Sequence, residues 1–306
     1  MKTWKKMALT LGVCMVAVGA IVMGAGYAMG GRPDITINFW NYPINVGVFG
    51  TGAGAHSGSV IIDETNLDAF TDLNISDSYG DIRVETGSAY SLKITGNPQD
   101  KPTYTLENGT LTVKGNSTAV VGIDLRDESS TIVVTVPSDA KLKEVTVEAD
   151  AGSVRLFGIT AERLAVTDSF GDVRVESSTL GTVKVSLDSG SLRMSDSTVT
   201  EGTLDNSFGE IRGEALSCTD LTVTNDSGDV DLQGELGSVK ATCSFGEIRV
   251  KTSLKASEFS YDLATDFGEI RVDGEKVGTA QRTDAKAPYT MNLKNDCGDI
   301  RVEFGA

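Results

Sequence analysis

The segment Asp168-Ser-Phe-Gly-Asp-Val-Arg-Val175 recurs in altered form along most of the chain. The related segments are Asp77–Val84, Asp150–Leu156, Asp188–Met194, Asn206–Gly213, Asp226–Leu232, Cys243–Val250, Asp266–Val272 and Asp296–Val302. Their central glycines are 19 residues apart from Gly152 to Gly228, and the later spacings are 18, 22 and 30 residues. A fixed period of this length, built from short strand-like pieces, is typical of a solenoid. The sequence therefore predicts an all-β fold, a single-stranded parallel β-solenoid with rungs of about 19 residues.

Each repeat has a pattern that tells the inside of a rung from the outside. The glycine suits a tight turn, and the residues two and four positions later are apolar, as in Val173 and Val175. Side chains alternate across a strand, so these residues share the inward face. A second apolar position lies five residues before the glycine, and a third short side is expected around Leu180, Val199 and Cys218. One buried column is predicted from Val173, Leu192, Ile211, Val230 and Ile248.

Two further positions in the repeat suggest structural roles. Three residues before the glycine, Asn206, Asn225 and Asn295 predict a partial ladder of stacked amides that bond to one another. Immediately before the glycine, bulky and small residues alternate: Phe170, Ser189, Phe208, Ser227 and Phe245. We expect this alternation to pack at a corner of the solenoid.

Two outward columns of charge follow the glycines. The acidic column, one residue after the glycine, comprises Asp81, Asp172, Glu210, Asp229, Glu247, Glu269 and Asp299, with Ser153 and Ser191 at the other two positions. The basic column, three residues after it, comprises Arg83, Arg155, Arg174, Arg193, Arg212, Arg249, Arg271 and Arg301, with Asp231 at the remaining position. Rungs about 4.8 Å apart would make either column repel itself, so side by side the two columns neutralise each other.

The paired columns have two interpretations. They are either a surface network that fixes register and prevents lateral aggregation, or a strip that binds an anionic envelope polymer. Asp231 places an acid in the middle of the arginine column, which favours the structural interpretation.

Composition excludes several classes of function. The first 33 residues carry four basic residues and no acid, which leaves 23 basic residues against 43 acids, a net charge of −20, for the rest. Such a body repels phosphate backbones, so we expect no nucleic-acid partner. The chain has four cysteines without CxxC spacing and a single histidine, so we expect no metal site. Cys218, Cys243 and Cys297 are expected to be small core residues.

The N-terminus has the pattern of a membrane anchor. Lys2, Lys5 and Lys6 precede an uncharged, mostly apolar run of 23 residues, 7–29, which is long enough to span a bilayer as a helix. The alternative is a cleaved signal peptide, with cleavage at the small residues Ala25 to Ala28, and a secreted body.

These features divide the chain into four parts. They are a cytoplasmic basic tail (1–6), a transmembrane helix or signal anchor (7–29), a glycine-rich linker leading into the solenoid (30–65), and an extracytoplasmic β-solenoid repeat domain (66–306). Within the linker, Gly50–Ala55 imitates a dinucleotide-binding fingerprint, but strand-like residues rather than a helix follow it. We therefore expect no cofactor.

From about Leu67 to Phe304 the chain resembles the "putative adhesin" family of bacterial β-strand-repeat proteins, DUF4097. Besides the glycine repeats, the resemblance includes Tyr90–Gly96, Pro102–Val113, Ile132–Pro137 and Leu142–Val147. It implies a stacked β-helix-like fold, a surface location and no assigned catalytic residues. Some members of this family occur in envelope-stress systems of Gram-positive bacteria.

The sequence is compatible with three candidate functions. The first is a non-catalytic, adhesin-like binding or scaffold module at the bacterial envelope, bound to an unknown envelope protein or polysaccharide. The second is a calcium-dependent adhesin, which the arginine beside each acid disfavours. The third is a carbohydrate-active β-helix enzyme, which needs paired carboxylates in a groove lined by substrate-binding groups. Aromatic residues make up only 6% of the chain, and Trp4 and Trp40 lie outside the repeats, so we expect no enzyme and no catalytic residues.

Overall fold

The chain forms two compact units. The computed structural model describes residues 34–39, 42–47, 59–97, 101–115, 130–283 and 286–305. One unit comprises residues 1–56 and 118–127, and the other comprises residues 57–117 and 128–306. In the first unit, β1 (Asp34–Phe39) and β2 (Tyr42–Gly47) pair as an antiparallel hairpin.

Several sequence-based expectations lie outside the described residues. They are the basic tail (1–6), the membrane helix or signal anchor (7–29) and the glycine-rich Gly50–Ala55. Within the described ranges, no helix is both long and apolar enough to cross a membrane.

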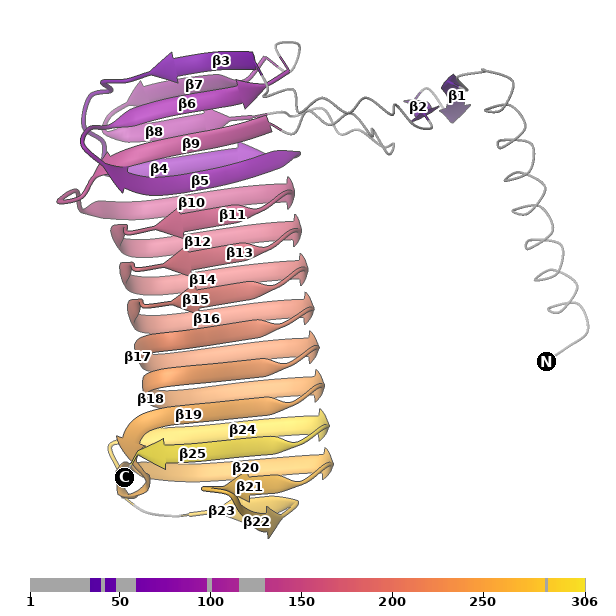
Figure 1. Ribbon diagram of the computed structural model, residues 1–306, viewed down its shortest axis with the longest axis vertical. Helices are drawn as coiled ribbons and strands as arrows, with labels where there is room; N and C mark the ends of the chain where they lie inside the picture. Colours follow the sequence, from indigo (N-terminus) through magenta and orange to yellow (C-terminus); the bar gives the residue numbers. More distant parts are fainter. Residues whose placement is uncertain are drawn as a thin grey trace, which may run out of the picture. The chain divides into compact units, whose positions relative to one another are not determined.

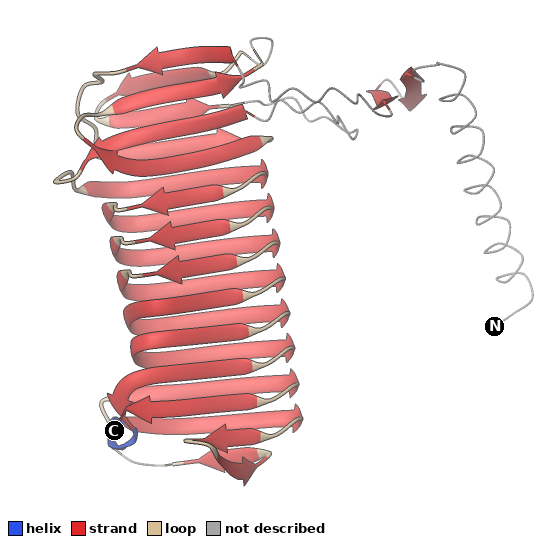
Figure 2. Cartoon of the chain, viewed as in Figure 1, coloured by secondary structure: helices blue, strands red, loops and turns tan. Residues whose placement is uncertain are grey.

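The second unit is a stack of β-strand rungs (Figures 1 and 2). The strands of its central part are β10 (Leu142–Ala151), β11 (Val154–Phe157), β12 (Thr160–Phe170), β13 (Val173–Glu176), β14 (Thr179–Ser189), β15 (Leu192–Ser195), β16 (Thr198–Phe208), β17 (Ile211–Ser227), β18 (Val230–Phe245) and β19 (Ile248–Lys255). Each pairs in parallel with the strand one rung away, as in Val166 with Val185 and Val173 with Leu192. These partners are 19 residues apart, so the predicted parallel rungs and their period are confirmed.

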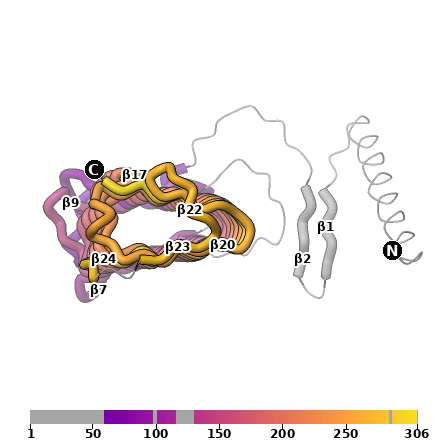
Figure 3. The backbone as a smooth tube through the Cα atoms, turned by 90° about the horizontal axis from the view of Figure 1, so that it is seen from below, coloured from indigo at the N-terminus to yellow at the C-terminus, as the bar shows by residue number. Residues whose placement is uncertain are grey.

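Each regular rung combines a long and a short strand in one flattened coil, seen end-on in Figure 3. The long strand β12 and the short strand β13 meet at Gly171, and we call this side of every rung the glycine corner. At the other end, β13 turns into β14 at an opposite corner. The expected third side is not a separate strand, because Leu180 and Val199 lie near the start of the long strands β14 and β16.

The core is the inside of the coil. Val173, Leu192, Ile211, Val230 and Ile248 are in register on successive rungs and each is at most 1% exposed, so the predicted column is confirmed. The alternation of inward apolar and outward polar residues therefore produces a continuous apolar interior.

Seven strands form the N-terminal end of this unit: β3 (Ser59–Glu64), β4 (Asp72–Asp77), β5 (Gly80–Gly87), β6 (Ser91–Gly96), β7 (Thr103–Glu107), β8 (Thr110–Lys114) and β9 (Ser130–Pro137). β4 and β5 are the first rung of the repeat type and pair in parallel with β10 and β11. Beyond them, β8 and β9 form a further parallel layer, and β6 and β7 pair with this layer in antiparallel fashion. This end closes the apolar interior with a mixed sheet.

The C-terminal end departs from sequence order. It contains a short 3-10 turn (Ala256–Glu258), β20 (Phe259–Phe267), β21 (Ile270–Val272), β22 (Glu275–Gly278), β23 (Ala280–Arg282), β24 (Tyr289–Cys297) and β25 (Ile300–Gly305). β24 pairs with β18 on one side and with β20 on the other, and β25 lies in the same way between β19 and β21. The last rung in sequence is thus the penultimate rung in space, and β22 and β23 form antiparallel pairs at the end.

Glycine is required where the rungs approach most closely. Gly190 has φ +143°, and a Cβ on it would collide with the carbonyl oxygen of Gly171 on the rung before. The same collision with the preceding glycine carbonyl would occur along the whole corner. At Gly213, which interrupts the inward apolar pattern, the side chains of Leu216 and Leu232 fill the space beside it.

The expected amide ladder has a different geometry. Asn206, Asn225 and Asn295 are buried, and each Nδ2 donates to the carbonyl of the preceding rung's glycine: Gly190 (3.0 Å), Gly209 (3.0 Å) and Gly246 (2.7 Å). The amides do not bond to one another, because the Oδ1 atom of each is buried without a hydrogen-bond partner. These side chains therefore tie rungs together at the glycine corner.

The expectation that the phenylalanines pack at the corner is wrong. Phe170, Phe208, Phe245 and Phe267 are 61–75% exposed. Strand alternation would put Phe208 on the same inward face as Asn206, two residues earlier. The strand β16 ends at Phe208, where the chain turns at Gly209, so the alternation does not continue to this position and the ring is exposed. The cysteine expectation holds in part: Cys218 and Cys243 are buried, whereas Cys297 is half-buried at this corner.

Candidate functional site

The two charge columns run along the outer face of the short strands. Each arginine lies between two inward residues, as Arg174 lies between Val173 and Val175. In spatial order the basic column is Arg83, Arg155, Arg174, Arg193, Arg212, Asp231, Arg249, Arg301 and Arg271. The structure therefore brings all the predicted ladder residues together on one face.

Most arginines pair with the acid of their own rung. The Nη2 to carboxylate distances are 2.9 Å for Arg174–Asp172, 3.0 Å for Arg249–Glu247, 3.3 Å for Arg301–Asp299, 3.4 Å for Arg271–Glu269 and 3.8 Å for Arg83–Asp81, and Arg212 pairs with Glu210. The two residues are separated by one inward residue, which places both side chains on the same face of the strand.

Two rungs lack an acid of their own because serine occupies the acidic column. There Arg155 pairs with Glu176 at 2.7 Å and Arg193 pairs with Glu214 at 2.6 Å, in both cases on the next rung. The Arg193 hydrogen bond holds the pKa of Glu214 below its usual range. All eight arginines of the column are consequently engaged by carboxylates.

These partners form a third outward column that the sequence reasoning missed. It lies five residues after the glycine and includes Glu176, Glu214, Lys251 and Glu303, of which Lys251 and Glu303 form a further pair at 3.3 Å. Strand alternation was the available signal, because positions one, three and five after the glycine share a face.

Aspartate and glutamate have different contacts in the acidic column. Asp81, Asp172, Asp229 and Asp299 each accept a hydrogen bond from the backbone N–H of the neighbouring rung, at 2.8–3.1 Å. Glu210, Glu247 and Glu269 pair with arginine through their longer side chains. Asp81, Asp172 and Asp299 thus contact both their own arginine and the backbone of the neighbouring rung, whereas the longer glutamates contact cationic side chains.

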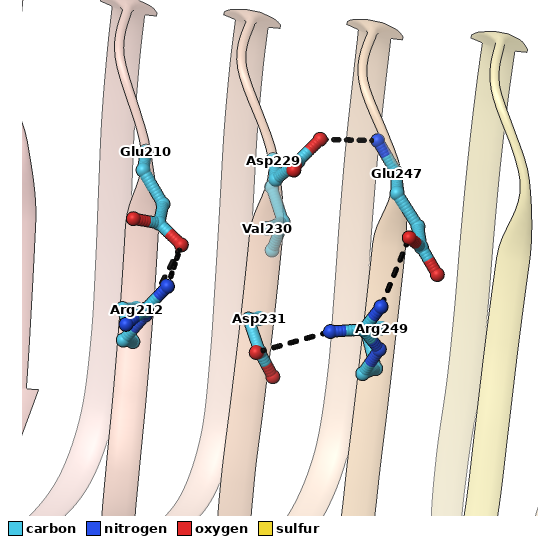
Figure 4. A pocket seen from close by; sticks show the side chains of 7 residues that line it. All are labelled: Glu210, Arg212, Asp229, Val230, Asp231, Glu247 and Arg249. Carbon is cyan, nitrogen blue, oxygen red and sulfur yellow. Dashed lines mark hydrogen bonds and ion pairs between the residues drawn. The ribbon is translucent and has the colours of Figure 1, made fainter.

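The break at Asp231 creates a small open depression of about 90 Å³ (Figure 4). Asp231 accepts from Arg249 Nη1 at 3.4 Å and from Gln233 at 3.2 Å, so the acid is absorbed into the network. Arg249 in turn bonds Glu247. The charged residues that line the depression therefore all have partners, either in ion pairs or, for Asp229, in the backbone N–H of Glu247.

A protein metal site needs several His, Cys, Asp or Glu ligands close together. No group of three or more His, Cys, Asp or Glu side chains within the described ranges could hold a metal ion. Asp168 lies in the interior, away from this network, and burial raises its pKa to about 6.

Comparison with known proteins identifies the family. The Toastrack DUF4097 model matches residues 56–303. The chain belongs to this family. The match spans the whole second unit except its last residues, and includes every rung that carries the charge columns.

Solved structures share the fold at low sequence identity. A "putative adhesin" from Bacteroides fragilis NCTC 9343 is 15% identical, with a TM-score of 0.52 over 79% of this chain and 96% of the other. Another "putative adhesin", from Parabacteroides distasonis ATCC 8503, is 11% identical, with a TM-score of 0.52 over 81% of this chain and 97% of the other. No curated protein matches the chain significantly. These likenesses establish the all-β fold and leave the function to be argued from the surface.

Proposed function

We propose that this chain is a non-catalytic binding or scaffold module of the bacterial envelope. An N-terminal helix, residues 7–29, holds it in the membrane, and its solenoid lies outside the cell. The observation that carries the proposal is the surface of the solenoid, a long periodic array of outward side chains over nine rungs of the repeat type. Such an array suits an extended partner, and the "putative adhesin" relatives agree with this role.

Within this proposal the charge columns have a structural task. Each arginine is already paired, at 37–53% side-chain exposure, so binding a polyanion would first require these pairs to break. Exposed pairs contribute only about 0–1 kcal/mol each, but a network of them fixes the register of the rungs. The net charge of −20 on the body also opposes an anionic polymer.

The two alternatives find less support. A calcium-dependent adhesin needs free carboxylates in its turns, whereas these acids contact arginines or backbone N–H groups. A glycan-cleaving enzyme needs two carboxylates flanking a substrate groove, and the depression at Asp231 offers carboxylates bonded to arginine. We therefore propose that the solenoid acts by binding a partner, and that this binding serves to sense envelope stress.

Protease shaving of intact cells that produce the full chain tests the topology. The positive-inside tendency of Lys2, Lys5 and Lys6 predicts that external protease removes the solenoid and leaves a short membrane-bound fragment. A solenoid that is degraded only after the cells are lysed would place it in the cytoplasm and contradict the proposal. Calcium titration of the purified chain is expected to leave its melting temperature unchanged.

A further inference from the structure

The glycine corner carries an exposed aromatic column that the charge network does not use. The position immediately before the glycine holds Tyr79, Phe170, Phe208, Phe245 and Phe267, with exposed fractions of 47%, 66%, 62%, 61% and 75%. We call these five residues the aromatic edge. Large apolar side chains gathered at one exposed site mark an interaction surface.

The spacing of the aromatic edge is regular in space, although it is irregular in sequence. The rungs between the aromatic ones carry Ala151, Ser189, Ser227 and Cys297, so every second rung is aromatic. In sequence Phe245 and Phe267 are consecutive in this column, but the strand β24 lies between β18 and β20 and places Cys297 between them. The fold thus restores an alternation that rung order along the chain would break.

The rungs that lack an aromatic residue carry an exposed carboxylate close to the same corner. On the rungs without an aromatic residue, the residue immediately before Ala151, Ser189, Ser227 or Cys297 is an aspartate. These aspartates are Asp150, Asp188, Asp226 and Asp296, and all four are exposed. The residue next to Tyr79, Phe170, Phe208 and Phe245 is serine: Ser78, Ser169, Ser207 and Ser244. With the exception of Asp266 beside Phe267, successive rungs therefore present an aromatic ring and then a carboxylate.

The dimensions of this pattern restrict the ligand. With rungs about 4.8 Å apart, rings recur every ~9.6 Å over a length of ~38 Å. An extended peptide repeats every two residues, about 6.7 Å, and drifts out of step with the rings. A β-1,4-linked glycan in its extended form repeats by the disaccharide, whose length is close to two rungs. Its sugar rings present apolar C–H faces to aromatic rings and hydroxyl donors to carboxylates, which are acceptors only.

The negative charge around the aromatic edge excludes some classes of ligand. The aromatic edge lies between the alternating aspartates on one side and the acidic column, Asp172, Glu210 and Glu247 among its members, on the other. An anionic polymer or a second copy of this chain would bring like charges together there. A partner without negative charge is the complementary one.

We propose that the aromatic edge binds a linear β-1,4-linked glycan that carries no negative charge, one disaccharide for every two rungs. This inference rests on the proposed envelope role and names the ligand class. Phe170, Phe208 and Phe245 stack on sugar rings, and Asp188 and Asp226 accept hydrogen bonds from the hydroxyl or amino groups between them.

Calorimetric titration of the detergent-solubilised full chain tests the proposal, with cello-oligosaccharides, oligosaccharides of N-acetylglucosamine and chitosan oligosaccharides as probes. Affinity for at least one series is expected to rise from tetrasaccharide to hexasaccharide to octasaccharide, as further rungs are engaged. The triple variant Phe170→Ser, Phe208→Ser, Phe245→Ser is expected to weaken binding at least tenfold. Serine already occupies this position at Ser189 and Ser227, so the fold should persist, and circular dichroism verifies it. The single variant Phe208→Ser, expected to weaken binding several-fold, serves if the triple variant does not fold.

Phe157→Ser is the matched control, because Phe157 is 43% exposed but lies at the end of β11, at the opposite corner. It should bind as the parent does. Equal affinity of the triple variant and the parent, or no binding of any series, would overturn the inference. So would tighter binding of polylysine than of every glycan, which would favour a cationic peptide, or dimers of the parent that the triple variant loses, which would favour a second copy.

Cosedimentation with isolated envelope material separates this inference from the proposed function. Envelope binding that is unaffected by the triple variant overturns the glycan assignment and keeps the envelope role. Absence of any envelope binding by the parent contradicts the envelope role itself.

Discussion

At the scale of single residues, the position three before the glycine shows how one interior site is used differently along the stack. Asn206, Asn225 and Asn295 donate to glycine carbonyls, and Thr265 does so through its hydroxyl at 2.9 Å. Asp168 occupies the same column and has no such donor when ionised. Its Oδ2 is buried without a hydrogen bond, and its pKa is raised to about 6 by burial.

Asp168→Asn is therefore expected to stabilise the protein above neutral pH. The folded-state pKa of Asp168 lies above its ordinary value of 3.8. The free-energy cost of burying the ionised carboxylate is therefore absent below about pH 4, and it grows as the pH rises to about 6 and the group loses its proton. Asparagine removes that penalty and supplies the donor for the carbonyl of Gly152. Urea unfolding should show a gain of about 1–3 kcal/mol at pH 8 and a much smaller gain at pH 4.

Ser169→Ala, one residue away and only half-buried, serves as the control and should change stability little at either pH. A loss of stability at pH 8 in Asp168→Asn would contradict the interpretation of Asp168 as a carboxylate that is destabilising when it is buried in its ionised form.

At the scale of the element, one rung is stabilised mainly by the rungs beside it. Val230 is fully buried between Ile211 and Ile248, while its neighbour Asp231 lies on the outer face. A carboxylate at position 230 would meet no donor among these apolar side chains.

Val230→Asp is expected to cost several kcal/mol and to unfold or split the array. Asp231→Arg, at the adjacent position, replaces one outward charge by the residue found on the other rungs and should change stability by less than about 1 kcal/mol. Thermal melting of the two variants against the parent measures both effects. Similar melting temperatures for Val230→Asp and the parent would refute the assignment of inside and outside.

The charge network also belongs to this scale. Replacing Arg174, Arg212 and Arg249 together with Gln removes contacts to Asp172, Glu210 and Glu247. We expect about 1–3 kcal/mol of lost stability in low salt, less in 1 M salt, and unchanged binding to envelope material. Loss of envelope binding in a variant with a native circular dichroism spectrum would show that the arginine column contacts the ligand.

At the scale of the whole molecule, the two-rung period of the aromatic edge can be separated from its composition. Deleting residues 190–208 removes one rung, and deleting 190–227 removes two, and both variants lose the same single aromatic residue, Phe208. Both deletions join residues at equivalent positions of the repeat, so both are expected to fold, with stability lowered by the lost rungs.

The deletion of 190–227 keeps aromatic and small rungs in alternation, and it should bind the glycan octasaccharide within a few-fold of the parent. The deletion of 190–208 places Ser189 next to Ser227 and breaks the alternation, and it should bind at least tenfold more weakly. Calorimetry on both variants makes the comparison, and equal affinities would show that spacing does not matter.

The sequence by itself determined the repeat, its 19-residue period, the inward column through Val173 and Val230 and the outward charge columns. These follow from strand alternation and the glycine requirement, which act within a few residues of chain. The third outward column containing Glu176 and Glu214 was open to the same reasoning.

Only the tertiary structure decided which rungs lie side by side at the C-terminal end. The insertion of β24 between β18 and β20 depends on pairing between residues about 50 positions apart, such as Ala241 with Leu293. The local pattern of β24 matches either neighbour equally well, so sequence order was a poor guide to spatial order. The tertiary structure also decided that Phe170 and the other residues of the aromatic edge are exposed. A phenylalanine at a turn gives no local sign of whether another segment of the chain covers it. The continuous aromatic edge exists for both reasons: parallel stacking aligns the column, and the displaced last rung completes its alternation.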